Sequence, residues 1–147
     1  MFGLLKSFPR PLERVLAADA TAVIGRISLT CAYWWGGLTK QLDFPGAVAE
    51  AHHLGLEPAG VIAGAAIVVQ LAGSAMIIVS FGTWLAAGAL AVFTLLATLF
   101  AHDFWNMQGI ERFHNLNSFL EHLGLIGGFV LVAVLDSRRA AQDRDHG

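Results

Sequence analysis

Three histidines and several charged side chains lie close together in the segment 101–128, between two strongly apolar segments. The histidines are His102, His114 and His122, and the carboxylate Glu121 directly precedes the last of them. Imidazole and carboxylate groups can ligate a metal, or they can hydrogen-bond a quinone and carry its protons, because histidine titrates near neutral pH. They can also form a buried hydrogen-bonded set that performs no chemistry. The residue types leave these three alternatives open.

The spacing of these residues predicts a cluster near one membrane boundary. His102 ends one apolar helix, and Glu121 and His122 lie in the first two turns of the next, about 5–8 Å from its end. We therefore expect His102, Asp103, Glu121 and His122 to lie at the same level, with His114 in the connecting loop. Glu121 shares a helix face with Gly124, where another helix can approach closely. Glu121 is therefore expected to point into the bundle.

No specific metal motif accompanies these histidines. The chain contains no HxxxH, HExxH or CxxC sequence, so we assign no residue as a metal ligand. The single cysteine, Cys31, excludes an internal disulfide and the paired-thiol chemistry of disulfide-generating membrane enzymes.

A second candidate site lies deeper in the apolar sequence, at Arg26 and Gln70. Arg26 stands about seven residues inside the first apolar segment, where an arginine costs about 2.5–3.5 kcal/mol unless it is paired. Gln70 lies at a similar depth in the next apolar segment, and Tyr33 shares the helix face of Arg26. We predict an Arg26–Gln70 contact with Tyr33 nearby. The alternatives are a structural pair that fixes helix register, or an arginine that reaches back to the headgroups.

The overall composition indicates that these polar groups belong to a membrane protein. The chain has 147 residues, of which 56% are hydrophobic and 14% charged, and its mean hydropathy is +0.62. Soluble domains carry about 25% charged residues. We therefore predict an integral membrane protein. The net charge of −2 and the absence of a basic run give no sign of nucleic-acid binding.

Four apolar segments are long enough to cross a hydrocarbon core, which needs about 20 residues per helix. Backbone groups in lipid must be satisfied within the segment, so helices are expected. The sequence predicts a single domain, 1–147, with an all-α fold: a four-helix transmembrane bundle. The expected helices are about 20–38, 59–80, 83–101 and 118–135.

The connections constrain how these helices are arranged. Only a tight turn, 80–83, separates the second and third helices, so they are expected to be antiparallel neighbours. The first loop contains a short helix signal at 45–55, which begins at Pro45 and stops at Gly55. The loop 106–117 is expected to cover the outer end of the bundle rather than to form the site itself.

Lysine and arginine positions predict the orientation. The flanks before the first helix and after the fourth carry six of them, and the two long loops carry two, Lys40 and Arg112. The positive-inside rule therefore places both termini in the cytoplasm, with the long loops on the outer side of a bacterial inner (plasma) membrane. The six flanking residues are Lys6, Arg10, Arg14, Arg138, Arg139 and Arg144.

A series of short motifs, taken in order, resembles the DoxX/DoxD-like family of small membrane proteins. The likeness extends from about Ala20 to Val134. The motifs are Arg26, Gly37-Leu38-Thr39-Lys40, Phe44-Pro45-Gly46, Gly55-Leu56 before Pro58, Gln70 with Gly73-Ser74, His102-Asp103-Phe104-Trp105, and the run Gly124 to Gly128. Gln70 stands where a glutamate is common in that family.

This resemblance implies a four-helix membrane protein of redox metabolism. Some members are linked to thiosulfate:quinone oxidoreduction, and others to membrane redox complexes that resist oxidative stress. The leading hypothesis is a redox-associated protein whose outer polar pocket engages a quinone, with Arg26, Gln70, His102, Glu121 and His122 as candidate ligand-binding residues.

The alternative hypothesis is a non-enzymatic accessory or scaffold subunit, which docks partner redox subunits or forms a homo-oligomer in the bilayer. A transporter is less favoured, because four helices without a visible inverted repeat do not suit alternating access.

Overall fold

The computed structural model describes residues 9–145, without the side chains of Asp143 and Asp145. Helices make up nearly all of this range and no strand occurs in it, which confirms the all-α prediction. The elements, in chain order, are α1 (Arg10–Ala17), α2 (Asp19–Leu42), α3 (Phe44–His53), α4 (Ala59–Ile78), α5 (Thr83–Ala101), the short 3₁₀ helix η2 (Phe104–Asn106) and α6 (Gly109–Asp145).

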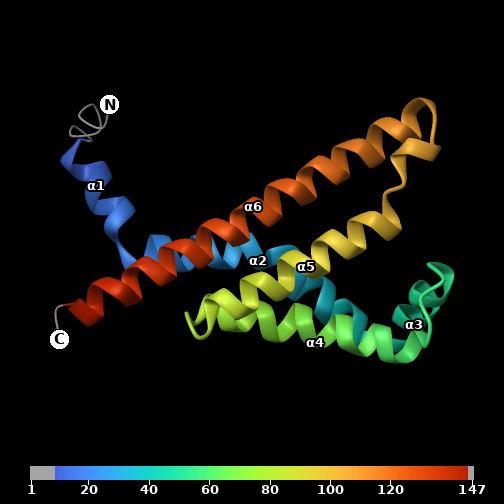
Figure 1. Cartoon of the computed structure of the whole chain (residues 1–147), viewed down its shortest axis with the longest axis horizontal. Coiled ribbons are helices and arrows are strands. Elements are labelled where there is room, and N and C mark those ends of the chain that lie inside the picture. The colour runs from blue at the N-terminus through green and yellow to red at the C-terminus, as the bar shows by residue number, and fades with distance from the viewer. Residues whose placement is uncertain (1–8, 146–147) are drawn as a thin grey trace.

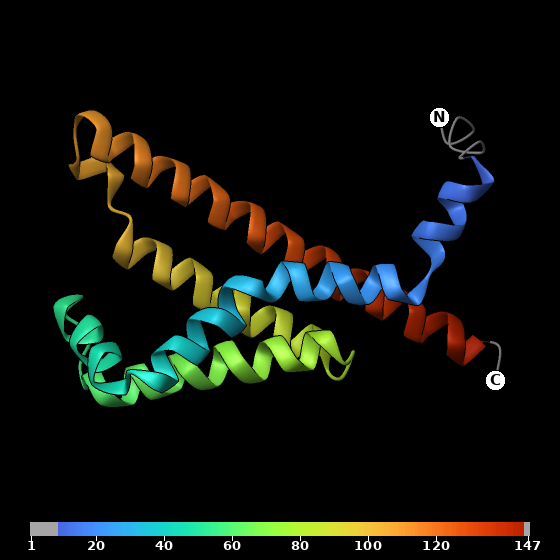
Figure 2. The ribbon, with the colours of Figure 1, turned by 180° about the vertical axis from the view of Figure 1, so that it is seen from behind.

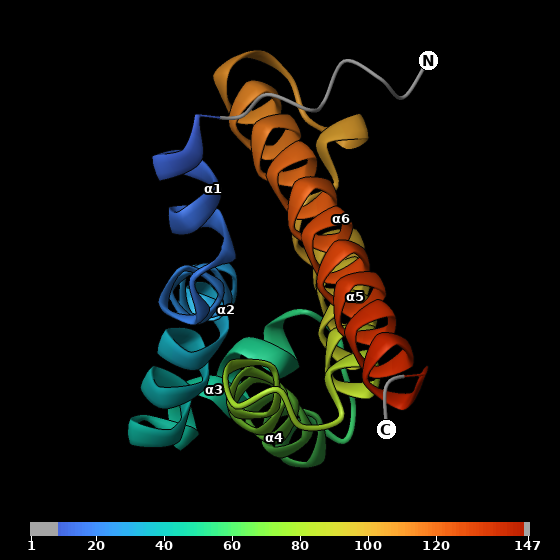
Figure 3. The same cartoon turned by 90° about the vertical axis from the view of Figure 1, so that its left-hand side faces the viewer.

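The helices form two packed pairs. Helix α2 packs along α4, and α5 packs along α6, whereas α2 and α6 touch only briefly. Helix α4 lies between α2 and the α5–α6 pair when the bundle is viewed from one end (Figure 3). The tight turn between α4 and α5 makes them antiparallel neighbours, as the sequence predicted.

The two pairs cross near one end of the molecule and diverge toward the other (Figures 1 and 2). Both described ends of the chain lie at the crossing end, and α3 and η2 lie at the diverging end. We call these the inner and outer ends, after the predicted orientation.

The core lies where the pairs meet. Tyr33 from α2, Ile77 from α4, Leu90 from α5 and Phe129 from α6 form it with small alanines of α5. Tyr33 stacks edge-on against Phe129, with ring centroids 5.2 Å apart. Because lipid rather than water surrounds the bundle, this small core is compatible with many exposed apolar side chains.

Within residues 9–145, three helices are long and apolar enough to cross a membrane, and the bent pair α1–α2 makes a fourth if it is counted as one span. The bend is 59°. It lies at Ala18, which has an extended backbone (φ −72°, ψ 134°) and interrupts the helix. Helix α1 therefore points well away from the axis of α2.

The fourth helix is much longer than the sequence indicated. Helix α6 begins at Gly109 rather than Ser118 and ends at Asp145 rather than Leu135. Most of the expected covering loop 106–117 is therefore helical, and that prediction was wrong. Gly109 (φ +61°) starts the helix, and nothing between 110 and 117 breaks it. Hydropathy marks only the apolar part of such a helix.

Helix α3 bridges the outer ends of α2 and α4. Its first turn is capped by Asp43, whose side chain accepts a hydrogen bond from the Gly46 N–H at 3.0 Å. Gly55, with φ +71°, adopts the left-handed conformation that follows the helix. Ala47 and Ala51 are buried, so α3 is packed against the bundle rather than free at its surface.

Candidate functional site

Two of the predicted outer histidines come together. His102 follows α5 and His122 lies on α6, and their ring centroids are 5.2 Å apart. Both residues are half-buried. The close packing of α5 on α6 holds the rings together, and η2 turns the chain between them. We call His102 and His122 the outer histidine pair.

The second hydrogen bond of Thr98 indicates the direction of the hydrogen bond between Thr98 and His122. The Nδ1 atom of His122 lies 2.6 Å from Thr98 Oγ1, and the Thr98 hydroxyl donates to the Thr94 carbonyl oxygen at 2.7 Å. A hydroxyl has one proton to give. With that proton on the carbonyl, Thr98 Oγ1 accepts from His122, and the imidazole carries its proton on Nδ1.

The same conclusion holds for His102. Its Nδ1 lies 2.9 Å from Asn115 Oδ1. The amide nitrogen of Asn115 donates to the Glu111 carbonyl oxygen at 3.1 Å, which fixes which end of the amide faces the histidine. The amide oxygen can only accept. His102 therefore also carries a proton on Nδ1.

Both members of the outer histidine pair thus present Nε2 as a lone-pair acceptor in their neutral forms. Among residues 9–145, no hydrogen bond involves either Nε2 atom. Two neighbouring acceptors of this kind can receive hydrogen bonds from hydroxyl groups.

The hydrogen bonds continue inward along α5. The Thr94 hydroxyl donates to the Leu90 carbonyl oxygen at 2.6 Å, and the Tyr33 hydroxyl lies 2.6 Å from Thr94 Oγ1. Since the Thr94 proton is already used, Tyr33 is the donor. Threonines four residues apart on α5 therefore receive one bond from α2 and one from α6. Sequence reasoning did not single out Thr94 or Thr98, although two threonines four residues apart share one face of an apolar helix and so indicate polar contacts there.

Glu121 does not join the cluster, and the expectation that it points into the bundle was wrong. Its side chain is exposed. Adjacent helical residues point about 100° apart, so the rotation that turns His122 toward α5 turns Glu121 away. The face of α6 that approaches another helix closely is at Gly128, where a Cβ would lie 2.8 Å from Leu29 Cδ1 on α2.

Arg26 does not contact Gln70, and that prediction was also wrong. Its guanidinium pairs with Asp136 Oδ1 of α6 at 2.6 Å and donates to the Ser80 hydroxyl at the end of α4. The side chain reaches toward the inner end, where a carboxylate is available. Sequence reasoning missed Asp136, which was visible as the acidic residue that ends the fourth apolar segment.

Gln70 lies buried between α2 and α4. A Cβ on Gly36 would lie 3.7 Å from Gln70 Oε1. That oxygen has no hydrogen-bond partner among the described residues, and the same is true of the Ser74 hydroxyl one turn further along α4. Gln70 is thus an isolated polar group in the helix interface, separate from the Arg26 ion pair.

A large apolar groove runs between α4 and α5, with α3 at its outer end. Its volume is about 780 Å³, within the range of small-molecule sites. Val69 lines it from α4, and Leu96 and Phe100 line it from α5. None of the five predicted site residues lines the groove, but Phe100 stands two positions before His102. The Lys40–Glu50 ion pair lies at its outer end.

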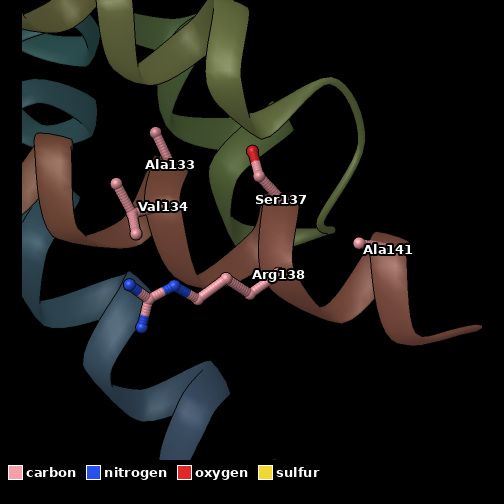
Figure 4. Close-up of a pocket in the computed structure, with 5 residues that line it drawn as sticks. All are labelled: Ala133, Val134, Ser137, Arg138 and Ala141. Carbon is pink, nitrogen blue, oxygen red and sulfur yellow. The ribbon is translucent and has the colours of Figure 1, made fainter.

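A smaller hollow of about 360 Å³ lies on the inner part of α6 (Figure 4). Ala133, Val134 and Ala141 form an apolar floor, and Ser137 and Arg138 supply polar groups. The Arg138 side chain extends from α6 toward the N-terminal helices in this view.

In the part of the chain that the structure describes, the histidines, carboxylates and cysteine do not gather into a metal centre. Within the described residues, no three His, Cys, Asp or Glu side chains are placed to hold one metal ion. Asp103, next to His102, instead accepts a hydrogen bond from the Asn106 side chain at 3.3 Å.

Comparison with known proteins gives two similarities. A family model described as DoxX matches residues 21–103. The inner membrane protein YphA of Escherichia coli (strain K12) is 25% identical over 128 residues, which make up 87% of this chain and 91% of that protein. No solved structure matches the chain. The matched family region includes Arg26, Gln70 and His102 and stops before His122.

Proposed function

The chain belongs to the DoxX family. We propose that it binds the reduced form of a membrane quinone, a quinol, at the outer histidine pair. It is an integral inner-membrane protein, as its apolar helices and its relative YphA indicate. An association with membrane redox processes would follow from such a ligand.

The observation that supports this proposal is the hydrogen-bond pattern that His102 and His122 share. Each ring uses its Nδ1 proton within the protein, so each neutral Nε2 is an acceptor. A quinol hydroxyl is a donor and matches such an atom, whereas a quinone carbonyl is an acceptor and does not. The neutral pair therefore favours quinol over quinone, and protonation of one ring turns that ring's Nε2 into a donor, which matches a quinone carbonyl.

The apolar groove between α4 and α5 supplies a place for the isoprenoid tail. It is lined almost entirely by apolar side chains and reaches Phe100 near the outer end of α5. Phe100 and His102 are two positions apart, and such positions point about 200° apart on a helix, so the ligand would pass around the outer end of α5. In this proposal the headgroup lies at the outer histidine pair and the tail lies along the groove. In this proposal Arg26 and Gln70 contribute to helix packing and do not contact the ligand.

The direct test is quinol binding by the purified protein. We expect His122→Phe to weaken binding of a short-chain quinol by about tenfold, the loss of roughly 1.4 kcal/mol, because one acceptor is removed. His114→Phe is the matched control, since His114 is an exposed histidine of the same helix. Equal affinity of wild type and His122→Phe would overturn the headgroup assignment.

A second variant separates the tail from the headgroup. Gly88 lines the groove and a Cβ there meets nothing within 4 Å, so Gly88→Leu should place side-chain volume in the groove. We expect it to weaken binding of long-chain quinols and to leave the short-chain quinol unaffected. Gly64→Leu, at an equally open glycine of α4 outside the groove, is the control. A loss of both ligands would show that the tail lies elsewhere.

The second candidate function is that of an accessory subunit. Only 6% of the most apolar window of α6 is buried, compared with 33% for α4 and 28% for α5. A transmembrane helix that is buried so little by its own bundle exposes a long surface on which a partner helix can pack. Crosslinking from Leu131, which is exposed on α6, should recover a partner redox subunit in native membranes. Recovery of lipid adducts alone would count against this function.

A further inference from the structure

Helix α1 has two sharply different faces. At 100° per residue, Leu12, Val15 and Leu16 fall on one side, and Arg10 and Arg14 fall on the other. All three apolar side chains are exposed, at 41–57%. No residue of α1 is buried, and the only helix that α1 contacts is α2. The described part of the chain therefore leaves the apolar face of α1 uncovered.

The geometry of the bend turns this face toward the membrane surface. In the predicted four-helix bundle α2 crosses the bilayer, and α1 departs from it by 59°. A short amphipathic helix in that position lies near the plane of the headgroups, with its apolar side in the acyl region and its basic side at the phosphates.

A second pair of arginines stands at the same end of the bundle. The Arg26–Asp136 pair fixes α2 to α6, so the residues before Arg26 and those after Asp136 lie together at the inner end. Arg138 and Arg139 are exposed there.

These four side chains lack internal partners. Among the described residues, Arg10, Arg14, Arg138 and Arg139 make no hydrogen bond or ion pair, in contrast to Arg26. Glu13 is the acidic residue of α1, so the basic groups of that face outnumber it.

The hollow on α6 adds an apolar part to this basic surface. Arg138 and Ser137 stand beside a floor of small apolar side chains that continues inward along α6 as far as Ala141 (Figure 4). A guanidinium and a hydroxyl suit a phosphate diester, and an alanine and valine floor suits an acyl chain.

We propose that α1 and the inner part of α6 form a binding site for an anionic glycerophospholipid of the cytoplasmic leaflet. Arg138 and Arg14 bind the phosphate-bearing headgroup, Leu12 and Leu16 enter the acyl region, and the hollow on α6 takes part of one chain. Charge complementarity selects anionic over zwitterionic lipid. The site is independent of the outer histidine pair, which lies at the opposite end of the bundle.

The test uses the full-length protein in detergent with added lipid. Native mass spectrometry would count retained phosphatidylglycerol and phosphatidylcholine, and thermal unfolding would report stabilisation. We expect selective retention of phosphatidylglycerol and a higher unfolding temperature with it. The double variant Arg14→Gln/Arg138→Gln should lower the retention about fivefold or more, because each basic side chain near the headgroups contributes to anionic-lipid binding.

Three comparisons make the result decisive. Arg112→Gln removes an exposed arginine at the outer end of α6 and should retain as much phosphatidylglycerol as wild type. Equal retention of the two lipids by wild type, or an equal loss in Arg112→Gln, would overturn the proposal. Stabilisation by inorganic phosphate alone to the same degree would show that the surface binds free anions rather than lipid, and would also overturn it.

Discussion

At the scale of single residues, the inner end of the bundle is defined by one three-way contact. Arg26 of α2 holds Asp136 of α6 and Ser80 at the end of α4. The Arg26 and Asp136 side chains are only 12% and 20% exposed. An ion pair with so little solvent stabilises a fold mainly because either charge alone is costly in an apolar setting.

Asp136→Leu should therefore destabilise the protein by about 3 kcal/mol, because it leaves Arg26 without its carboxylate. The double variant Arg26→Leu/Asp136→Leu should recover most of this loss, since no buried charge remains. Thermal unfolding in detergent measures both. Asp19→Leu, at a carboxylate without an ion pair at the start of α2, should have little effect. A double variant less stable than Asp136→Leu would contradict this account.

Glu57 provides a pH-dependent contact outside the membrane-spanning segments. One carboxylate oxygen pairs with His52 Nδ1, and the other accepts the Ala59 N–H at 2.9 Å, at the start of α4. The hydrogen bond with His52, followed by that of the Ala59 N–H, holds the pKa of Glu57 below its ordinary value. A carboxylate with a lowered pKa stabilises the fold above its unfolded pKa, and this contribution is lost as the pH falls through the folded pKa.

His52→Leu should raise the pKa of Glu57 toward its ordinary value, so that the α3–α4 connection opens at a higher pH on acidification. Hydrogen exchange of the Ala59 amide against pH would measure this shift. His53→Leu is the control, because His53 is adjacent and exposed but does not bond Glu57. The same shift in both variants would argue against the specific His52 contact.

At the scale of elements, glycines determine how closely the helices pack. A Cβ on Gly37 would lie 2.8 Å from Leu71 Cγ and 3.1 Å from Gln70 Cβ, so α2 and α4 are in close contact there. On the same helix, a Cβ on Gly25 would meet nothing within 4 Å. Two glycines of α2 thus have different roles, and only the structure distinguishes them.

Gly37→Ala should destabilise the protein by about 1–3 kcal/mol, because both neighbouring atoms are close to the α4 backbone and cannot easily move. Gly25→Ala should be neutral or stabilising by up to about 1 kcal/mol, since alanine favours helix. Thermal unfolding of the two variants under identical conditions tests the difference. Equal destabilisation would mean that α2 is sensitive to any side chain at a glycine position.

The sequence predicted the apolar elements well and their polar contacts poorly. Apolar length alone located the segments that became α2, α4, α5 and α6, because hydrophobic burial in lipid does not depend on partners. Placing His102 beside His122 followed from their common level at one boundary. The partners of Arg26 and the direction of Glu121 depend on helix rotation and on side-chain reach, which hydropathy does not determine.

At the scale of the whole molecule, the orientation in the membrane is still a prediction. Both described ends lie together at the inner end, which agrees with an even number of crossings if α1–α2 counts as one. The basic residues Arg10, Arg14, Arg138 and Arg139 gather there, opposite Lys40 and Arg112.

Reporter fusions should therefore show both termini in the cytoplasm. A fluorescent protein that folds only in the cytoplasm should be bright at either terminus, and alkaline phosphatase should be inactive there. The same phosphatase inserted at residue 108, before α6, should be active. Opposite signals from the two termini would mean that α2 does not cross the membrane.

The inner contact of Arg26 with Asp136 and Ser80 also has a mechanical consequence. It joins three helices at one end, whereas the helix pairs diverge toward the other (Figure 1). A small rotation of the helix pairs about this fixed end would displace α3 and η2 the farthest, because these two elements lie at the opposite end of the bundle. For the proposed hydrophobic ligand, entry from the bilayer would then need movement only at the outer end, with the Arg26 contact as the fixed point.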